Sequence, residues 1–179
     1  PPVRTAFPVG AVHEAELIGS MVVAGAPSVD DPVRQVLDDE AALLAGDTSG
    51  AEVHRRRFDL GRIAAGSVLL TLTDVAAGTV VDLAASEHVG AAGQLVTLGQ
   101  HAGLRYVARG GASETFESLD IIGTRYLNAS VRVPAGAAAP GIGLAIRDRH
   151  RPRPAGASFA CSDPLLEQIH AVGLRTVDL

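Results

Sequence analysis

The sequence predicts a mainly β fold, an antiparallel β-sandwich of jelly-roll type followed by a short C-terminal amphipathic helix. Three observations lead to this prediction: apolar and polar residues alternate with a period of two through the middle of the chain, turn signals containing Gly separate these runs, and a helical period follows near the end. Alternating strands bury one face against another layer, which favours two packed antiparallel sheets. Parallel βαβ units would need helical runs of about 10–15 residues between the strands, and the pattern shows none.

Residues 1–50 have the least regular pattern, and we expect them to lead in from an upstream domain. Residues 15–25 (AELIGSMVVAG) fit one strand. Residues 30–47 fit a short helix or a structured loop, because Asp31 can cap a helix that begins with Pro32. An Asp-Asp-Glu run in the middle of this segment interrupts the apolar spacing and weakens the prediction of a helix.

Residues 51–150 are expected to form the β-sandwich domain. The runs that place apolar side chains on one face are 67–75, 79–86, 124–134 and 141–149. The Ala-Ala-Gly between the first two runs favours a hairpin loop, which would pair these strands directly. Gly110 and Gly111 mark a turn between two short strands in residues 104–118. Polar residues such as Asp82 and Asn128 alternate with the apolar ones, so we expect them on the outward face.

Residues 151–179 are expected to form a connector rich in Pro and Arg, followed by the final helix. Asp163 can cap this helix, with Pro164 next. Apolar residues then recur on one helical face at Leu165, Ile169 and Val172. Gly173 costs about 1 kcal/mol relative to Ala in a helix interior. No later residue covers the apolar stripe, so we expect it to fold back on the sheet or to pack against a partner domain.

Composition limits the classes of function. The formal net charge is −5 and all fifteen basic residues are Arg, so the chain lacks the overall positive charge of a nucleic-acid-binding domain, and no nucleic-acid partner is expected. The single cysteine, Cys161, excludes an intramolecular disulfide. The sequence shows no signal-peptide pattern and no run long enough to span a membrane, so no membrane partner is expected and the localisation stays open.

Three stretches resemble bacterial α-L-rhamnosidases of glycoside hydrolase family 78. RRRFDLGRIAAGSVLLTLTDVAAGTVVDLAASEHV (55–89) is similar to the family segment that opens a β-sandwich domain. ARGGASETFESLDIIGTRYLNASVRV (108–133) resembles the glycine turn, the "ETFEP" stretch and the following "RY" strand of that domain. SFACSDPLLEQIHAVGLRT (158–176) resembles the F-x-C-S-D-P-L-L signature at the start of the helical catalytic domain.

The resemblance implies a fragment of a modular enzyme. In this family, β-sandwich domains flank an (α/α)6 barrel, and the barrel holds the two carboxyl groups of an inverting glycosidase, which stand about 6.5–9.5 Å apart. Both would lie downstream of Leu179, so the resemblance implies no catalytic, metal-binding or cofactor-binding residue in this chain, and no cofactor. The implied partners are the (α/α)6 domain of the same polypeptide and, through the whole enzyme, rhamnosides. An autonomous lectin-like carbohydrate-binding module is the alternative.

The candidate acid–base and metal-binding residues have ordinary interpretations. Glu114 and Glu117 should face opposite sides of a strand, which does not suit an acid–base pair. Arg125 is expected to be an exposed strand end, or else buried and paired with Glu117 or Glu87. No His-x-His motif occurs, so we expect isolated residues rather than metal ligands at His13, His54, His88, His101, His150 and His170.

The two basic clusters, 54–58 and 147–154, are expected to be solvated faces or contacts with an acidic neighbouring domain. No His and Asn arrangement activates the Cys161 thiol, so we expect it to be packed and inert. Sugar sites commonly use aromatic rings, and this chain has no Trp, two Tyr and four Phe, which argues against autonomous sugar binding. We expect the hydrophobic core to take up Phe58, Phe116 and Phe159.

Overall fold

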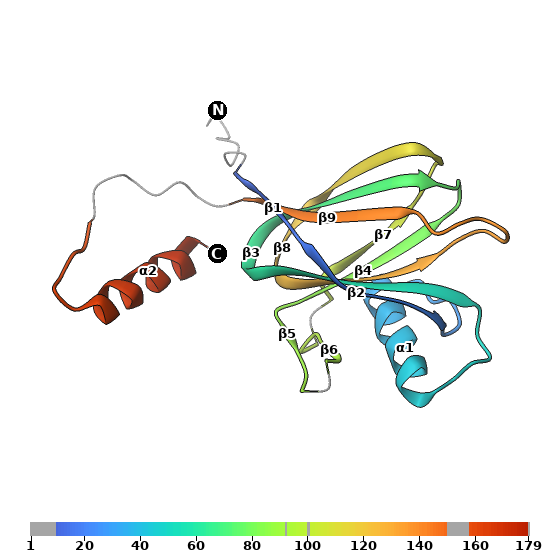
Figure 1. Cartoon of the computed structure of the whole chain (residues 1–179), viewed down its shortest axis with the longest axis horizontal. Coiled ribbons are helices and arrows are strands. Elements are labelled where there is room, and N and C mark those ends of the chain that lie inside the picture. Colours follow the sequence, from blue (N-terminus) through green and yellow to red (C-terminus); the bar gives the residue numbers. More distant parts are fainter. Residues whose placement is uncertain (1–9, 92, 100, 150–157, 179) are drawn as a thin grey trace, which may run out of the picture.

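The computed structural model describes residues 10–91, 93–99, 101–149 and 158–178, which form a mainly β structure with two helices (Figure 1). The strands are β1 (Val12–Glu14), β2 (Glu16–Ala24), β3 (Glu52–Val75), β4 (Val80–Ser86), β5 (His88–Val89), β6 (Leu95–Val96), β7 (Gly103–Val107), β8 (Gly111–Arg132) and β9 (Gly141–Asp148). The helices are α1 (Pro32–Ala45) and α2 (Pro164–Asp178). The predicted antiparallel β fold with a C-terminal amphipathic helix is confirmed.

The strands form one seven-stranded antiparallel sheet in the order β1-β9-β3-β8-β4-β7, with β2 paired to β3, while β5 and β6 form a separate pair. Two long strands, β3 and β8, run through both halves of this sheet. The first half of β3 pairs with β2 and with the second half of β8, whereas its second half pairs with β9 and with the first half of β8. The β3–β8 register breaks between Asp59 and Ala64, where β3 passes from one half to the other.

One buried cluster joins the two halves of the sheet. Its fully buried large side chains are Phe58, Leu83 and Leu127 from the half that contains β4, and Leu70, Leu72, Leu144 and Ile146 from the half that contains β9. These are the apolar positions of the period-two runs, so the alternation correctly predicted which strand faces meet in the core. The β-sandwich arrangement and its jelly-roll type stay predictions.

The predicted hairpin between residues 67–75 and 79–86 is wrong. The turn exists, since the backbone N–H of Thr79 donates to the Ala76 carbonyl at 3.1 Å, but β8 lies between β3 and β4 in the sheet. The turn carries the chain from the half that contains β9 to the half that contains β4, and a local turn signal cannot distinguish this from a hairpin. The turn at Gly110 and Gly111 is confirmed, with φ values of 94° and 147°. It leads into one 22-residue strand rather than a short one.

Helix α1 follows its predicted signals closely. Asp31 caps it by accepting the Arg34 N–H at 3.0 Å, Pro32 begins it, and Gly46 ends it with a left-handed φ of 70°. The helix packs against β4 on the side of the sheet opposite the main core (Figure 1). Asp82 and Asn128 point away from the main core, as expected, but α1 covers this face and leaves them only 1% and 2% exposed.

Helix α2 contacts the sheet through Arg175, which donates to the Ile63 carbonyl of β3 at 2.6 Å, while most of the helix lies to one side of the sheet in Figure 1. Asp163 caps it, accepting the Leu165 N–H at 2.9 Å, and Leu165 and Ile169 on its apolar stripe are 61% and 58% exposed. The prediction that Phe159 belongs to the core is wrong, because its ring is 46% exposed and contacts the His170 ring. Within the described part of the chain, neither helix has the length and apolar character needed to cross a membrane. The domain boundaries at residues 50 and 150 stay predictions.

Candidate functional site

Charged side chains share the contact between α1 and the sheet with a small apolar cluster that contains Val33, Val36 and Ala84. Helix α1 turns Asp39 and Glu40 inward, where they are 0% and 7% exposed. Arg132 of β8 donates to Asp39 at 2.6 Å, and Arg105 of β7 donates to Asp82 of β4 at 2.6 Å. Two residues of the Asp-Asp-Glu run that weakened the helix prediction, Asp39 and Glu40, thus join α1 to the sheet through ion pairs.

Glu40 lies between two arginines of β3. Its carboxylate accepts a hydrogen bond from Arg57 at 3.1 Å and one from the backbone N–H of Leu95 at 2.9 Å, and Arg55 lies 3.6 Å away. Arg57 also donates to Asn128 at 2.7 Å and to the Gly93 carbonyl. The expectation that residues 54–58 form a solvated face or contact another domain is wrong for these two arginines, which pair with a helix of the same chain.

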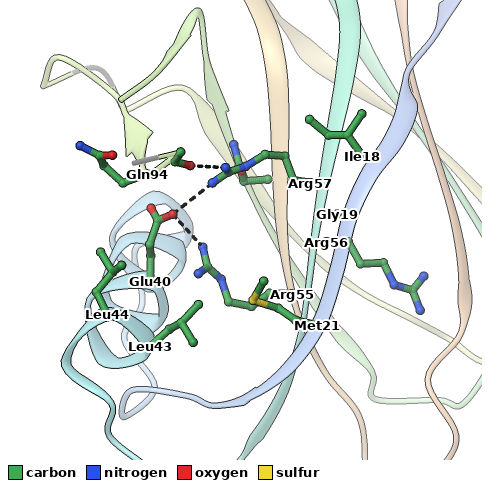
Figure 2. A pocket seen from close by; sticks show the side chains of 12 residues that line it. Ile18, Gly19, Met21, Glu40, Leu43, Leu44, Arg55, Arg56, Arg57 and Gln94 are labelled. Atoms are coloured by element: carbon green, nitrogen blue, oxygen red, sulfur yellow. Dashed lines mark hydrogen bonds and ion pairs between the residues drawn. The ribbon is translucent and has the colours of Figure 1, made fainter. Parts of the chain in front are cut away.

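A hollow of about 290 Å³ opens beside this ion cluster, between α1, β2, β3 and the residues before β6. Its lining residues are Ile18, Gly19, Met21, Glu40, Leu43, Leu44, Arg55, Arg56, Arg57, Gly93, Gln94 and Asn128. In Figure 2, Arg55 and Arg57 point toward Glu40, whereas Arg56 extends away from it. The hollow therefore combines cationic groups with aliphatic walls.

Two buried donors at the hollow lack acceptors. Among the described residues, no hydrogen-bond partner lies within reach of Arg55 Nε or Asn128 Nδ2. Arg55 is only 8% exposed, and its burial lowers the pKa of its guanidinium. A buried polar group without a partner costs free energy, so these two groups suit a ligand that supplies acceptors.

The acidic residues that the sequence singled out lie in separate environments. Glu114 accepts hydrogen bonds from the Tyr106 hydroxyl at 2.7 Å and from two backbone N–H groups, and the Tyr106 bond is the largest cause of the lowered pKa of Glu114. Glu117 accepts from the Ser67 hydroxyl and from Arg147 and Arg149. Both carboxylates are thus bound by donors of the chain itself.

Arg125 does not pair with either predicted partner. It forms a bidentate ion pair with Asp59 of β3, at 2.9 and 3.0 Å, and its guanidinium lies 4.9 Å from the centre of the Tyr126 ring. Its side chain is 38% exposed, so the pair is partly solvated. The hypothesis of a buried pair with Glu117 or Glu87 is wrong, because β3 runs alongside β8 and brings Asp59 closer.

The described histidines and the cysteine make separate contacts and do not form a cluster. His13, His54 and His101 each lie beside one carboxylate, at 2.7, 3.2 and 3.4 Å. The described residues contain no group of three or more His, Cys, Asp or Glu side chains that could hold a metal ion. Cys161 is half-buried, with its sulfur 3.2 Å from the Asp163 carbonyl. His150 and most of the second basic cluster lie outside the described residues.

Comparison with solved structures identifies the architecture. A family 78 rhamnosidase of Bacillus sp. GL1 matches 72% of this chain at 28% identity, with a TM-score of 0.60. The chain resembles a region of the family 78 rhamnosidases. An α-L-rhamnosidase of Dictyoglomus thermophilum has the same fold over 65% of the chain, at 18% identity and a TM-score of 0.51. In each case the match spans 13% of the solved chain, which is consistent with one domain of a larger polypeptide. No family model matches this chain, and no curated protein matches it.

The resemblance to a region of the family 78 rhamnosidases was predicted from the sequence, but the hollow was not. One signal was present: three consecutive arginines in a strand must place the first and third on the same face, here Arg55 and Arg57. The acidic pair Asp39 and Glu40 in the predicted helix could have suggested what that face meets. The site was missed because the arginines were expected to meet solvent or another domain, and the acidic run was considered only as an interruption of the helical apolar spacing.

Proposed function

We propose that this chain is a non-catalytic β-domain of an α-L-rhamnosidase-like glycoside hydrolase, and that it packs against and orients the (α/α)6 catalytic domain of an inverting glycosidase. The match to the Bacillus rhamnosidase carries the proposal, because it covers 72% of this chain and only 13% of the solved one. In this proposal residues 1–50 lead in from an upstream domain, 51–150 form the β-domain, and 151–179 provide the connector and the first catalytic-domain helix.

The exposed stripe of α2 supports this role. Leu165, Ile169 and Val172 are 61%, 58% and 66% exposed, although they share one face of a capped helix. A contiguous apolar face of this kind commonly marks a contact surface. Packing that face against further helices would bury it, as the start of a helical barrel requires.

Hydrolysis of an aryl α-L-rhamnoside tests the proposal. The 179-residue chain should be inactive. A longer polypeptide, which also contains the residues encoded on both sides of this chain, should hydrolyse the substrate. Ile169→Asp should lower the melting temperature of the longer polypeptide and leave that of the isolated chain nearly unchanged, because only the longer protein would bury this position. Turnover by the isolated chain would refute the proposal.

The alternative, an autonomous lectin-like module, makes a different prediction. It requires saturable binding of L-rhamnose by this chain alone, in the millimolar range or tighter. The accessory-domain role predicts no such binding, and a calorimetric titration distinguishes the two.

A further inference from the structure

We propose that the hollow between α1 and β2 binds a small organic carboxylate. Arg55 and Asn128 both line it, both are more than nine-tenths buried, and in the described structure Arg55 Nε and Asn128 Nδ2 have no acceptor. They come from neighbouring strands, since Asn128 stands opposite Arg57 in the β3–β8 register. Two unpaired donors at one hollow favour a ligand that only accepts hydrogen bonds. This inference is independent of the proposed hydrolase role.

The charges around the hollow favour an anion. The ion pairs beneath α1 join four arginines to three carboxylates: Arg55, Arg57, Arg105 and Arg132 with Asp39, Glu40 and Asp82. Arg55 is a member of this cluster that lines the hollow, and it lies 3.6 Å from Glu40, a carboxylate that already accepts from Arg57 and Leu95. At 3.6 Å the contact of Arg55 with Glu40 is an ion pair without a hydrogen bond. A ligand anion would supply the missing acceptor.

The shape and walls of the hollow favour a carboxylate with an apolar body. A planar guanidinium offers parallel N–H groups that match the two oxygens of a carboxylate. Aliphatic side chains, Ile18, Met21, Leu43 and Leu44, line the remainder, and no aromatic ring is among the lining residues. A volume of about 290 Å³ is near the lower end of small-molecule sites, which suits a ligand about the size of one ring.

Calorimetric titration of the 179-residue chain tests this site with four probes: benzoate, D-glucuronate, benzyl alcohol and inorganic phosphate. Benzoate should bind saturably and benzyl alcohol, which has the same body without the charge, should not. Binding of D-glucuronate as well would extend the ligand class to acidic sugars. Phosphate binding as tight as that of both acids would overturn the choice of a carboxylate. No saturation by either acid up to the order of 10 mM would overturn the site itself.

Substitutions on one strand supply the matched control. Arg55→Met should weaken benzoate binding about tenfold or more, because it removes the cation that meets the ligand. Arg62→Met, on the same strand β3 but not among the residues that line the hollow, should leave binding unchanged. Asn128→Asp keeps the side-chain size and the acceptor for Arg57 but places a negative charge at the hollow, so it should abolish binding even if Arg55→Met fails to fold. Equal binding by the wild type, Arg55→Met and Asn128→Asp would refute the proposal.

Discussion

Replacing Glu40 with Gln should strongly destabilise the fold. The Glu40 side chain is 9% exposed, accepts from Arg57 at 3.1 Å and from the Leu95 N–H at 2.9 Å, and lies 3.6 Å from Arg55. Gln is nearly the same size, so the substitution removes the charge without opening a cavity and leaves the buried Arg55 and the partly buried Arg57 facing a neutral group. Breaking a buried ion pair costs about 3–5 kcal/mol.

We expect the lower end of that range, because the Arg57 side chain is 23% exposed and water compensates part of its charge. A loss of about 3 kcal/mol corresponds to a melting temperature about 6–12 °C lower for a chain of this size. Urea unfolding followed by far-ultraviolet circular dichroism measures the loss, since the chain has no Trp for fluorescence.

Asp38→Asn is the matched control, on the same helix and with the same change of charge. Asp38 pairs with Arg34 at 2.7 Å, but the Arg34 side chain is 67% exposed, and such pairs contribute only about 0.3–0.5 kcal/mol. Added salt should reduce the effect of Asp38→Asn and hardly change that of Glu40→Gln, because buried pairs are screened less. If the two variants lose the same free energy of unfolding within about 0.5 kcal/mol, the conclusion that the buried ion cluster holds α1 on the sheet is refuted.

Three further predictions concern the core, the final helix and acid unfolding. Leu127→Ala, at a 0% exposed position, should cost about 2–5 kcal/mol in urea unfolding, whereas Leu119→Ala, at a 98% exposed one, should cost less than about 0.5 kcal/mol; equal losses would contradict the assigned core. Gly173→Ala should increase the helical circular dichroism signal, because a methyl group there meets no atom within 4 Å and Ala is favoured by about 0.8–1 kcal/mol; an unchanged signal would contradict this. The Tyr106 hydroxyl lowers the pKa of Glu114, so this carboxylate stabilises the fold above the ordinary Glu pKa of 4.5, and the contribution disappears as the pH falls through the lowered pKa. Glu114→Gln should therefore reduce the loss of stability on acidification below pH 4.5, and unfolding curves with the same pH dependence as wild type would exclude this role.

Local chemistry made much of the fold predictable. The alternation that places Leu70, Leu72 and Leu127 on buried strand faces follows from the two-residue period of an extended chain, which needs no knowledge of the partner strand. Likewise, Asp31 and Asp163 cap helices through hydrogen bonds to residues two or three positions away. The three segments that resemble the family 78 rhamnosidases independently indicated the similarity that the solved structures show.

Strand partners and the covered polar face were decided only by the tertiary structure. A turn signal specifies where the chain reverses but not which strand lies beside it, so the placement of β8 between β3 and β4 could not be derived from residues 67–86. The sequence shows that Asp82 and Asn128 point away from the core, but only the position of α1 shows that they are buried. Ion pairs such as that of Arg132 with Asp39, 93 positions apart, form because folding brings distant charges together out of water, and no local pattern encodes that distance.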